Sequence, residues 1–353
     1  MMNENMLDVS PSAFCVENNI VWGVHATLNY LFSYDLSTGF VEIYDIYPHS
    51  IIGRESSFIG ICKYENYVYL VPCWSSKLIS YNIEKKTIKV IEDGSNSKGR
   101  FGKSFVIEDK LYCIPMYEDF FMVVDLKKGC IERKIPWKHM MANKESVIMD
   151  SFLFDNRIVC LVKDCPEDVV LLDYNCDITR RAIQNNGEQL ITGCSSEENM
   201  FLCSPKTGMI FQYDKNFSFQ KSIRVKGTSF ATLNFMNDML ILDNIEKAEK
   251  SIYFIENEQE KIINSQVKKT PLSYTGMHGI FYYSNGLTYY FDRAKNELYV
   301  VDRNNKYETF RIEINKKMAD DIIKNNITKE GLILERYYTN LGFFIECITG
   351  EST

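Results

Sequence analysis

The sequence has little of what most sites with recognisable motifs require. It contains four histidines, three tryptophans and no C-x-x-C pair, so neither a zinc site nor a dithiol motif is encoded. No apolar run approaches the roughly 20 residues of a membrane-spanning helix. The first ten residues, MMNENMLDVS, have neither the basic region nor the apolar stretch of a secretion signal. We therefore expect a protein without a membrane partner, a metal or a cofactor.

Positive charge is also in short supply. The chain of 353 residues carries 40 Lys and Arg against 47 Asp and Glu, a net charge of −7, so a global basic surface for nucleic acid is missing. Eleven cysteines, an odd number in a long chain, predict free thiols in a reducing, bacterial-like cytoplasm. Hydrophobic residues make up 45% and aromatic residues 13%, which predicts a globular chain rich in strands.

One short pattern recurs along the chain: an apolar strand, a polar turn, a second strand, a third strand with an acidic or amide residue, and another turn. Residues that tolerate left-handed backbone dominate the turns. The first turn falls at 18–19, 65–66, 108–109, 155–156, 198–199, 237–238 and 285–286, and the second at 38–39, 85–86, 128–129, 176–177, 215–216, 257–258 and 304–305.

The third strands give the period of this repeat. Their acidic or amide residues run from Asp35 to Asp302, which lie 267 residues apart over six intervals, a mean of 44.5 residues. Four short antiparallel strands with their turns need about that length. Two repeats match closely, because Asn66–Pro72 (NYVYLVP) aligns with Asp109–Pro115 (DKLYCIP). Each proline falls where a second strand should stop donating to its neighbour.

Seven such units resemble the seven-bladed β-propeller class of kelch-like and WD-like repeat proteins. The resemblance is one of architecture, because the chain has neither a kelch-type Gly-Gly doublet nor a WD-type Gly-His…Trp-Asp pair. No functional residue of those families is therefore carried over. The predicted fold is an all-β propeller over residues 1–314. Six blades remain an alternative because residues 229–266 are the least regular repeat.

The predicted first blade contains all four of its own strands, at about 12–17, 20–26, 30–35 and 40–46. The ring would then close by packing rather than by a strand shared between the termini. The remaining residues, 315–353, break the repeat. Met318, Ile322 and Ile323 predict one short helix, and Leu334 to Ile348 follow helical spacing. We expect a helical tail packed on the propeller, with docking of a partner on the tail as the alternative.

The propeller resemblance also implies a candidate site. In this class, the loop leading into each blade and the loop between its second and third strands emerge on one face, around a central channel. Polar groups converging there suit a small ligand or a peptide, and exposed aromatic residues suit a protein partner. The leading loops supply Arg54, Arg100 with Lys103, Glu145, Glu188 and His278, and the second-to-third strand loops supply His25, Trp74 and Tyr117.

Two chemistries remain open at this face. Arg54 and Arg100 occupy corresponding loops, so they could clamp a carboxylate or phosphate, or pair with Glu145 or Glu188. His278 lies between glycines before a predicted innermost strand and is the one weak catalytic candidate. The sequence favours a binding or scaffolding module for a protein, peptide or small ligand. The alternative is a cofactor-free lyase or hydrolase at the channel mouth.

Overall fold

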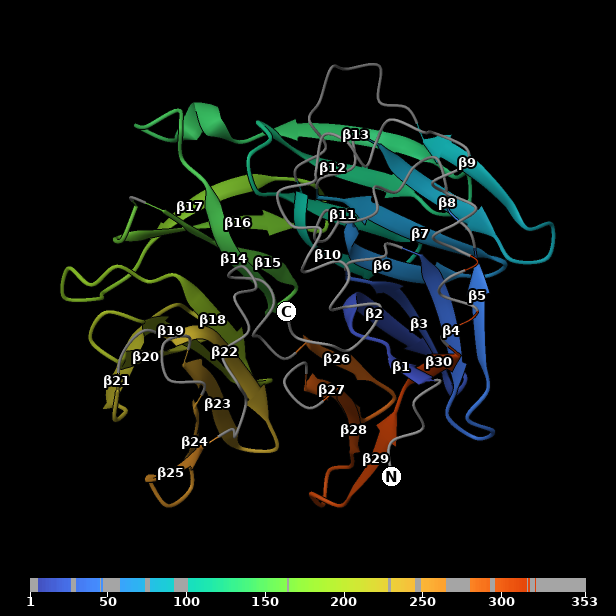
Figure 1. Cartoon of the computed structure of the whole chain (residues 1–353). Coiled ribbons are helices and arrows are strands. Elements are labelled where there is room, and N and C mark those ends of the chain that lie inside the picture. The colour runs from blue at the N-terminus through green and yellow to red at the C-terminus, as the bar shows by residue number, and fades with distance from the viewer. Residues whose placement is uncertain are drawn as a thin grey trace, which may run out of the picture. The chain divides into compact units, whose positions relative to one another are not determined.

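The computed structural model in Figure 1 shows a chain built almost entirely of antiparallel strands. It describes residues 6–26, 30–44, 46, 58–73, 77–91, 101–163, 165–227, 230–244, 249–264, 280–292, 296–315, 317 and 321. Among these residues the one helical element bounded by the structure is a short 3₁₀ helix, η1 (Lys138–Met140).

The described strands form seven four-stranded sheets, each made of four consecutive strands in the order of the sequence. The first three blades are β2 (Pro11–Glu17), β3 (Ile20–His25), β4 (Leu31–Asp35) and β5 (Val41–Tyr44); β6 (Phe58–Tyr64), β7 (Tyr67–Pro72), β8 (Leu78–Asn82) and β9 (Thr87–Ile91); and β10 (Phe101–Ile107), β11 (Lys110–Pro115), β12 (Phe120–Asp125) and β13 (Cys130–Pro136).

The other four sheets repeat this plan, so the protein is a seven-bladed β-propeller. They are β14 (Ile148–Phe154), β15 (Arg157–Val162), β16 (Asp168–Asp173) and β17 (Ile178–Ala182); β18 (Thr192–Ser195), β19 (Asn199–Ser204), β20 (Met209–Asp214) and β21 (Phe219–Arg224); β22 (Phe230–Met236), β23 (Met239–Asn244), β24 (Glu249–Phe254) and β25 (Gln259–Asn264); and β26 (Ile280–Ser284), β27 (Leu287–Asp292), β28 (Glu297–Val301) and β29 (Tyr307–Arg311).

The chain divides into two compact units. Unit 1 comprises residues 1–100, 296–298 and 309–353, and unit 2 comprises residues 101–295 and 299–308. Blades 1 and 2 belong to unit 1 and blades 3–6 to unit 2, whereas the residues of blade 7 are divided between them. Within unit 2 the first strands β10, β14, β18 and β22 lie next to one another in sequence order (Figure 1).

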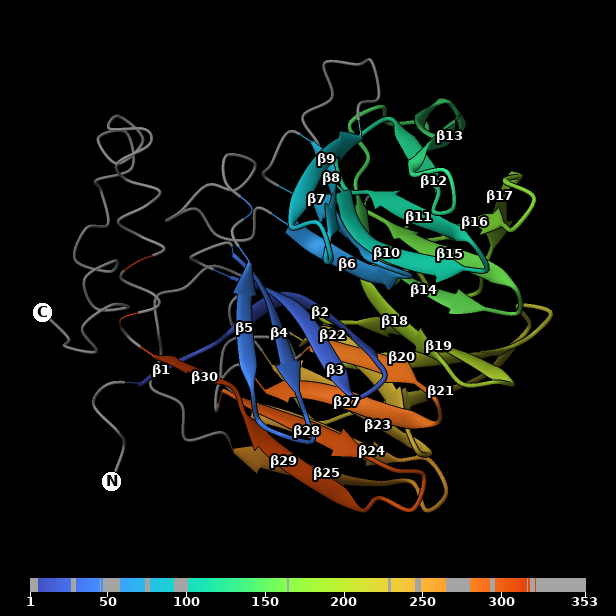
Figure 2. The ribbon, with the colours of Figure 1, turned by 90° about the vertical axis from the view of Figure 1, so that its right-hand side faces the viewer.

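The predicted first blade is confirmed, apart from the ends of its strands, and none of the described four-stranded blades combines strands from the two ends of the chain. A separate ribbon lies beside blade 1 in unit 1 (Figure 2), where β1 (Met6–Asp8) pairs with β30 (Glu313–Asn315). In the tail, residues 317 and 321 are helical, and its other residues from 316 onward lie outside the described part. The predicted tail helices and the boundary at 314 therefore stay predictions.

The acidic residue that marks each third strand has a local structural role. Asp173 Oδ1 accepts hydrogen bonds from the backbone N–H groups of Asn175 and Asp177, both at 2.9 Å. Asp214 and Asp302 cap the turns of their own blades in the same way, at 2.8–3.0 Å. The first turns of blades 1, 4, 6 and 7 carry paired left-handed residues, as at Asn18 and Asn19. Both features match the strong right-handed twist of two-residue hairpins and the side-chain capping of tight turns.

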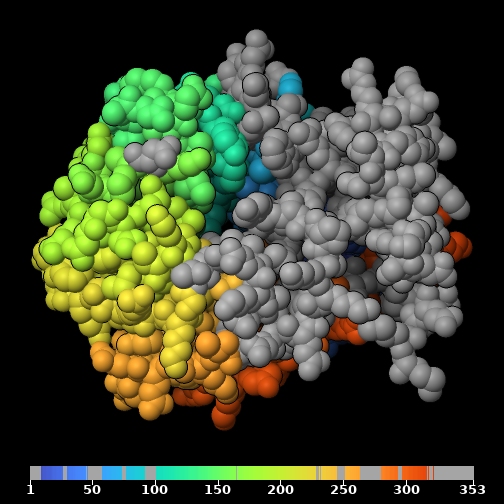
Figure 3. Space-filling view, turned by 60° about the vertical axis from the view of Figure 1, so that its left-hand side comes forward, coloured from blue at the N-terminus to red at the C-terminus, as the bar shows by residue number. Residues whose placement is uncertain are grey.

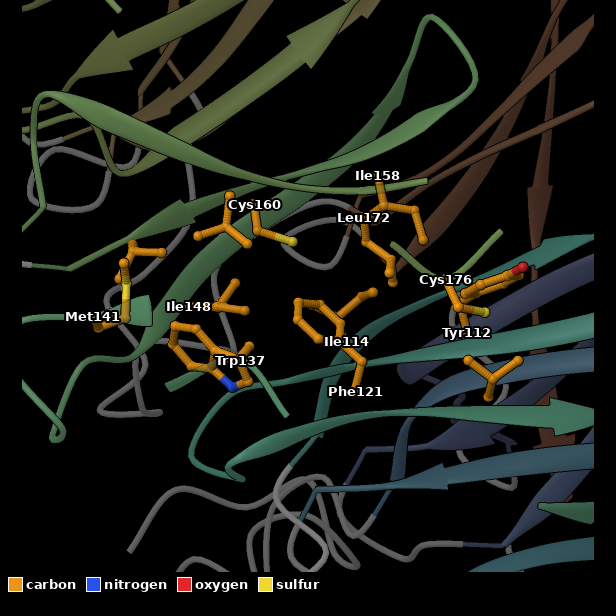
Figure 4. Close-up of a cluster of buried hydrophobic side chains, with 13 residues drawn as sticks. Tyr112, Ile114, Phe121, Trp137, Met141, Ile148, Ile158, Cys160, Leu172 and Cys176 are labelled. Atoms are coloured by element: carbon orange, nitrogen blue, oxygen red, sulfur yellow. The ribbon is translucent and has the colours of Figure 1, made fainter. Parts of the chain in front are cut away.

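The hydrophobic core lies between neighbouring blades. In unit 2 the cluster between blades 3 and 4 includes the fully buried Trp137 and Phe121, whose ring centroids are 6.3 Å apart in an edge-to-face arrangement (Figure 4). The predicted burial of Cys113, Cys160 and Cys203 is confirmed, because each is 0% exposed. These thiols act as small apolar side chains, since burial raises the pKa of Cys203 to about 12.

Gly193 in β18 is required by the packing between blades 4 and 5. A Cβ atom there would lie 2.5 Å from Phe152 Cε1, 2.8 Å from Leu202 Cδ2 and 3.0 Å from the Phe201 carbonyl oxygen. We expect Gly193→Ala to lower the free energy of unfolding by about 2 kcal/mol through overpacking. Gly102→Ala is the matched control, because its Cβ would meet nothing nearer than 3.7 Å. Equal urea midpoints for the two variants would contradict this account.

Candidate functional site

The first strands of blades 3–6 are joined at their loop ends by one hydrogen-bonded network. Lys103 Nζ of β10 lies 2.6 Å from Asp150 Oδ1 of β14. The Thr192 hydroxyl of β18 donates to Asp150 Oδ2 at 2.8 Å and accepts from the backbone N–H of Leu233 in β22 at 2.9 Å. We call Lys103, Asp150, Thr192 and Leu233 the inner-strand network. It therefore links four consecutive blades of unit 2.

The repeat itself places these side chains. Asp150 pairs with Leu161, and Thr192 pairs with Cys203, which are both the fifth residue of their second strands. In blades 3, 4 and 6 the pairing of the first strand with the second contains a register shift next to the network residue. In blade 4 this shift lies between Ile148 and Asp150. A bulge of this kind re-aims the following side chain. Here it accompanies polar side chains that reach across to the next blade.

Asp150 is a saturated hydrogen-bond acceptor. Besides Lys103, its Oδ1 accepts from the backbone N–H of Ser151 at 2.8 Å, and besides Thr192, its Oδ2 accepts from the backbone N–H of Gly193 at 3.1 Å. Its side chain is only 11% exposed. A carboxylate held by four donors has little hydrogen-bonding capacity left for a further partner. Its role is to hold groups from three blades in place.

Lys103 is the member of the network that faces solvent. Its ammonium donates to Asp150 and to the Ser151 carbonyl oxygen at 3.2 Å, and its side chain is 55% exposed. An ammonium has three N–H donors, so one remains for a ligand. The arrangement therefore presents a positively charged donor, already oriented by two bonds, to a carboxylate or carbonyl oxygen.

The surrounding loops of blades 3 and 4 are held by their own side chains. Lys138 Nζ donates to the Tyr117 carbonyl oxygen at 3.2 Å and pairs with Asp119 at 2.9 Å. Lys144 Nζ donates to three carbonyl oxygens at the end of η1, at 3.1–3.3 Å. Tyr117 and Met149 remain 47% and 44% exposed. Loops held in this way lose little conformational freedom when a ligand binds.

Four of the predicted site residues, Arg54, Trp74, Arg100 and His278, lie outside the described residues. The guanidinium clamp and the catalytic histidine accordingly stay predictions.

The two glutamates predicted at the site, Glu188 and Glu145, lie in loops with local hydrogen bonds. Glu188 Oε2 accepts from the Ser204 and Thr207 hydroxyls of blade 5 at 2.7 and 3.0 Å, so it organises the loops of its own blade. Glu145 is exposed, and its backbone N–H donates to Asn143 Oδ1 at 2.9 Å. Neither residue is part of the inner-strand network.

His25 ends β3 in unit 1, where its ring centroid lies 4.9 Å from that of Tyr30. Burial lowers the pKa of His25 to about 4, so the imidazole is neutral at physiological pH.

Sequence reasoning missed Asp150 and Thr192, although it placed Lys103 in a leading loop. Both residues pair with the fifth residue of the second strand of their blade. A sequence alignment of the repeats on that fifth residue would therefore have placed Asp150 and Thr192 at equivalent positions. Asp150 was hidden because a strand bulge shifts it by one residue relative to the turn, whereas the register of Thr192 has no such shift.

Comparison with known proteins supports the fold and defines no family. No family model matches the sequence, and no curated protein matches it. Solved structures do match. Virginiamycin B lyase from Staphylococcus aureus has a TM-score of 0.63 at 11% identity, covering 82% of this chain and 95% of the lyase. The WD40 β-propeller domain of Doa1 has a TM-score of 0.55 at 8% identity, covering 86% and 93%. At such identities the likeness shows a shared propeller fold.

Two further observations concern the described residues only. No group of three or more His, Cys, Asp or Glu side chains there is arranged to hold a metal ion. No helix there has the length and apolarity to cross a membrane.

Replacing Asp150 should weaken the packing of blades 3–5. In Asp150→Ala the buried Thr192 hydroxyl and the Gly193 N–H lose their acceptor, so we expect a loss of about 3 kcal/mol in the free energy of unfolding. Glu198→Ala is the control, since its 71% exposed side chain pairs only with Lys215 at the surface and should cost under about 1 kcal/mol. Chemical denaturation measures both. If Asp150→Ala loses no more stability than the control, Asp150 does not hold blades 3–5 together through the inner-strand network.

His25 should make stability depend on pH. Its pKa falls from 6.5 to about 4 on folding, so the unfolded chain binds more protons between these values. Stability is therefore complete above pH 6.5 and is lost as the pH falls toward 4. Between pH 7 and 5 we expect the wild type to lose about 1 to 2 kcal/mol more than His25→Gln, measured by urea unfolding. Parallel pH profiles for the two proteins would refute this role.

Proposed function

We propose that this propeller is a binding module that holds a partner at its loop face, where Lys103 donates to a carboxylate or carbonyl oxygen of that partner. One observation carries the proposal. Asp150 already accepts from four donors. The side-chain group of the network that is left for a partner is therefore the third N–H of Lys103. A group fixed in this way is suited to recognition rather than to proton transfer.

Apolar contacts support the same proposal. Met149 directly precedes Asp150 and is 44% exposed. A Cβ on Gly102, the neighbour of Lys103, would lie 3.9 Å from Met116 Cε, so the loop that carries the exposed Tyr117 approaches the strand that carries Lys103. An oriented charge next to exposed apolar side chains is the usual composition of a protein or peptide contact. A reducing cytoplasm suits the ten described cysteines, which are all free.

The alternative function is a cofactor-free lyase or hydrolase with His278 as general acid or base. Its support is analogy of fold, because one similar structure is a catalytically inactive virginiamycin B lyase from Staphylococcus aureus, in which a histidine is replaced by alanine, with quinupristin. That activity belongs to the lyase. For this chain it is a hypothesis that a His278→Ala variant tests.

Affinity capture from the native host tests the binding function. We expect the full chain to retain a partner that Lys103→Met retains at least tenfold less, because a charge-assisted hydrogen bond contributes about 1.5 to 3 kcal/mol. Lys127→Met is the control, since Lys127 lies in the turn between β12 and β13, away from the loop face, and pairs with Asp109. Quantitative mass spectrometry compares the captured proteins.

Identical captured sets for wild type, Lys103→Met and Lys127→Met would rule out this contact. A version ending at residue 314 in the same experiment tests docking on the tail. Loss of a captured protein only in that version would move the binding site to residues 315–353.

A further inference from the structure

A second surface of unit 2 has the features of a binding groove. It lies where the outer three strands of blade 4 meet the turn between β20 and β21 of blade 5, and its volume is about 360 Å³. This size falls within the range of ligand pockets. Figure 3 shows the green to orange surface of unit 2 to which these blades contribute. The lining residues are Arg157, Leu171, Asp173, Asp177, Thr179, Arg180, Arg181 and Phe217.

Two guanidinium groups lie over the ring of Phe217 in this groove. The Cζ atoms of Arg157 and Arg181 are 6.0 and 5.8 Å from the ring centroid. Arg181 donates one hydrogen bond to the Asn216 carbonyl oxygen at 2.9 Å. Arg157 forms a long ion pair with Asp155, at 4.0 Å. Each guanidinium has five N–H donors, so most of them remain for a ligand. The ring fixes the position of both cations.

Arg180 differs from its neighbour. Its side chain donates to the Met140 carbonyl oxygen at 2.9 Å and pairs with Asp168. Arg180 also lines the groove, but these contacts engage its guanidinium, whereas Arg181 keeps most of its N–H donors for a ligand.

The floor of the groove is built at an energetic cost. Phe217 is 6% exposed and has a φ of 61°, a left-handed conformation that is rare for a bulky residue. Its ring packs edge-to-face on Phe154 with centroids 5.9 Å apart. The corresponding left-handed turn residues in blades 4 and 7 are Cys176 and Asn305, which are small or polar. The aromatic side chain in blade 5 therefore creates a surface that the other turns lack.

β17 offers a free edge beside this floor. It is the outermost strand of its sheet, and residues 179–182 are exposed. Backbone hydrogen bonds join Ile183 N to Glu167 O at 2.9 Å and Asp173 N to Asp177 O at 3.1 Å. Hydrogen-bonded pairs alternate along an antiparallel ladder, so the odd-numbered residues face β16. The backbone groups of Ile178, Arg180 and Ala182 consequently point outward, available to another strand.

Charge varies along this edge. Arg181 lies at one end of the groove and the exposed Asp177 at the other, four residues apart, or about 13 Å along the strand. Asp173 is engaged in its own turn through Oδ1. A partner strand would therefore meet Arg181 at one end and Asp177 at the other, and Arg157, which pairs with Asp173, extends over Phe217 from the Asp177 end.

We propose that an extended peptide segment of a partner protein adds to the free edge of β17. Its acidic side chain binds between Arg157 and Arg181 over Phe217, and a neutral or basic residue four positions away lies opposite Asp177. The backbone groups of residues 178, 180 and 182 supply affinity, and the charges supply register and specificity. This site does not include Lys103. It is formed by the outer strands of blade 4 and by the turn between β20 and β21 of blade 5.

A phage library of random linear decapeptides, selected on the immobilised full chain, provides the probes. Enriched peptides are synthesised and their dissociation constants measured by fluorescence anisotropy. We expect acidic residues to be enriched, and Arg157→Met and Arg181→Met each to weaken binding about tenfold. Arg224→Met, an exposed arginine on the outer strand of blade 5, and Lys103→Met should leave binding unchanged. Bound peptide should slow hydrogen exchange at residues 178, 180 and 182.

Several results would overturn the proposal. Enriched peptides without acidic residues, unchanged affinity in both arginine variants, or no slowing of exchange along β17 would each show that the arginines only protect the edge from aggregation. If an arginine-to-methionine variant fails to fold by circular dichroism, Arg181→Lys replaces it and should weaken binding several-fold, because the bidentate contact is lost. Loss of binding in Lys103→Met would assign the peptides to the loop face instead.

Discussion

The architecture follows from one constraint: a four-stranded sheet with apolar side chains on both faces cannot expose either face to water. Val159 and Leu171 of blade 4 are buried against Met200 and Leu202 of blade 5, while Cys203 and Ile210 on the opposite face of blade 5 are buried against blade 6. Each blade therefore supplies half of two cores, and burial of apolar area at about 25 cal/mol per Å² favours stacking of neighbours over any isolated blade. Edge-to-face rings such as Phe154 and Phe217 add geometric selectivity to that non-directional force.

Polar groups on the inner strands complement this packing. Asp150 brings a charge to an 11% exposed position, which is tolerated because four donors from three blades surround it. A buried carboxylate satisfied so completely has little capacity left for chemistry, and the same saturation orients Lys103. The interaction that aligns the blades thus also orients the exposed ammonium of Lys103. Glu188 shows the same principle within one blade, where two hydroxyls occupy the carboxylate that sequence reasoning had assigned to a ligand.

The fold was predictable because its signals are local. Asn18 and Asn19 adopt left-handed backbone in a hairpin turn, and Asp214 caps its own turn through two N–H bonds, so each blade marks its own boundaries in the sequence. The site was less predictable because its geometry is non-local. Lys103 and Asp150 meet only through the packing of two blades, and a bulge shifts their register relative to the turns. Nothing in the local sequence indicates that the Ser204 and Thr207 hydroxyls donate to Glu188 Oε2.

The ribbon of β1 and β30 has a consequence for the order of assembly. Leu7 and Ile314 pair although nearly the whole chain separates them, and among the described residues three pairs and the hydrogen bond from the Val9 N–H to the Ile312 carbonyl oxygen, at 2.9 Å, hold the ribbon together. Closing so long a loop in an unfolded chain costs more entropy than these few pairs return, so the two strands meet after the intervening repeats have condensed. The same argument makes the ribbon the first pairing to open on heating. The ribbon closes last and opens first, so its pairing reports on the integrity of unit 1, in whose core Ile312 and Ile314 are buried.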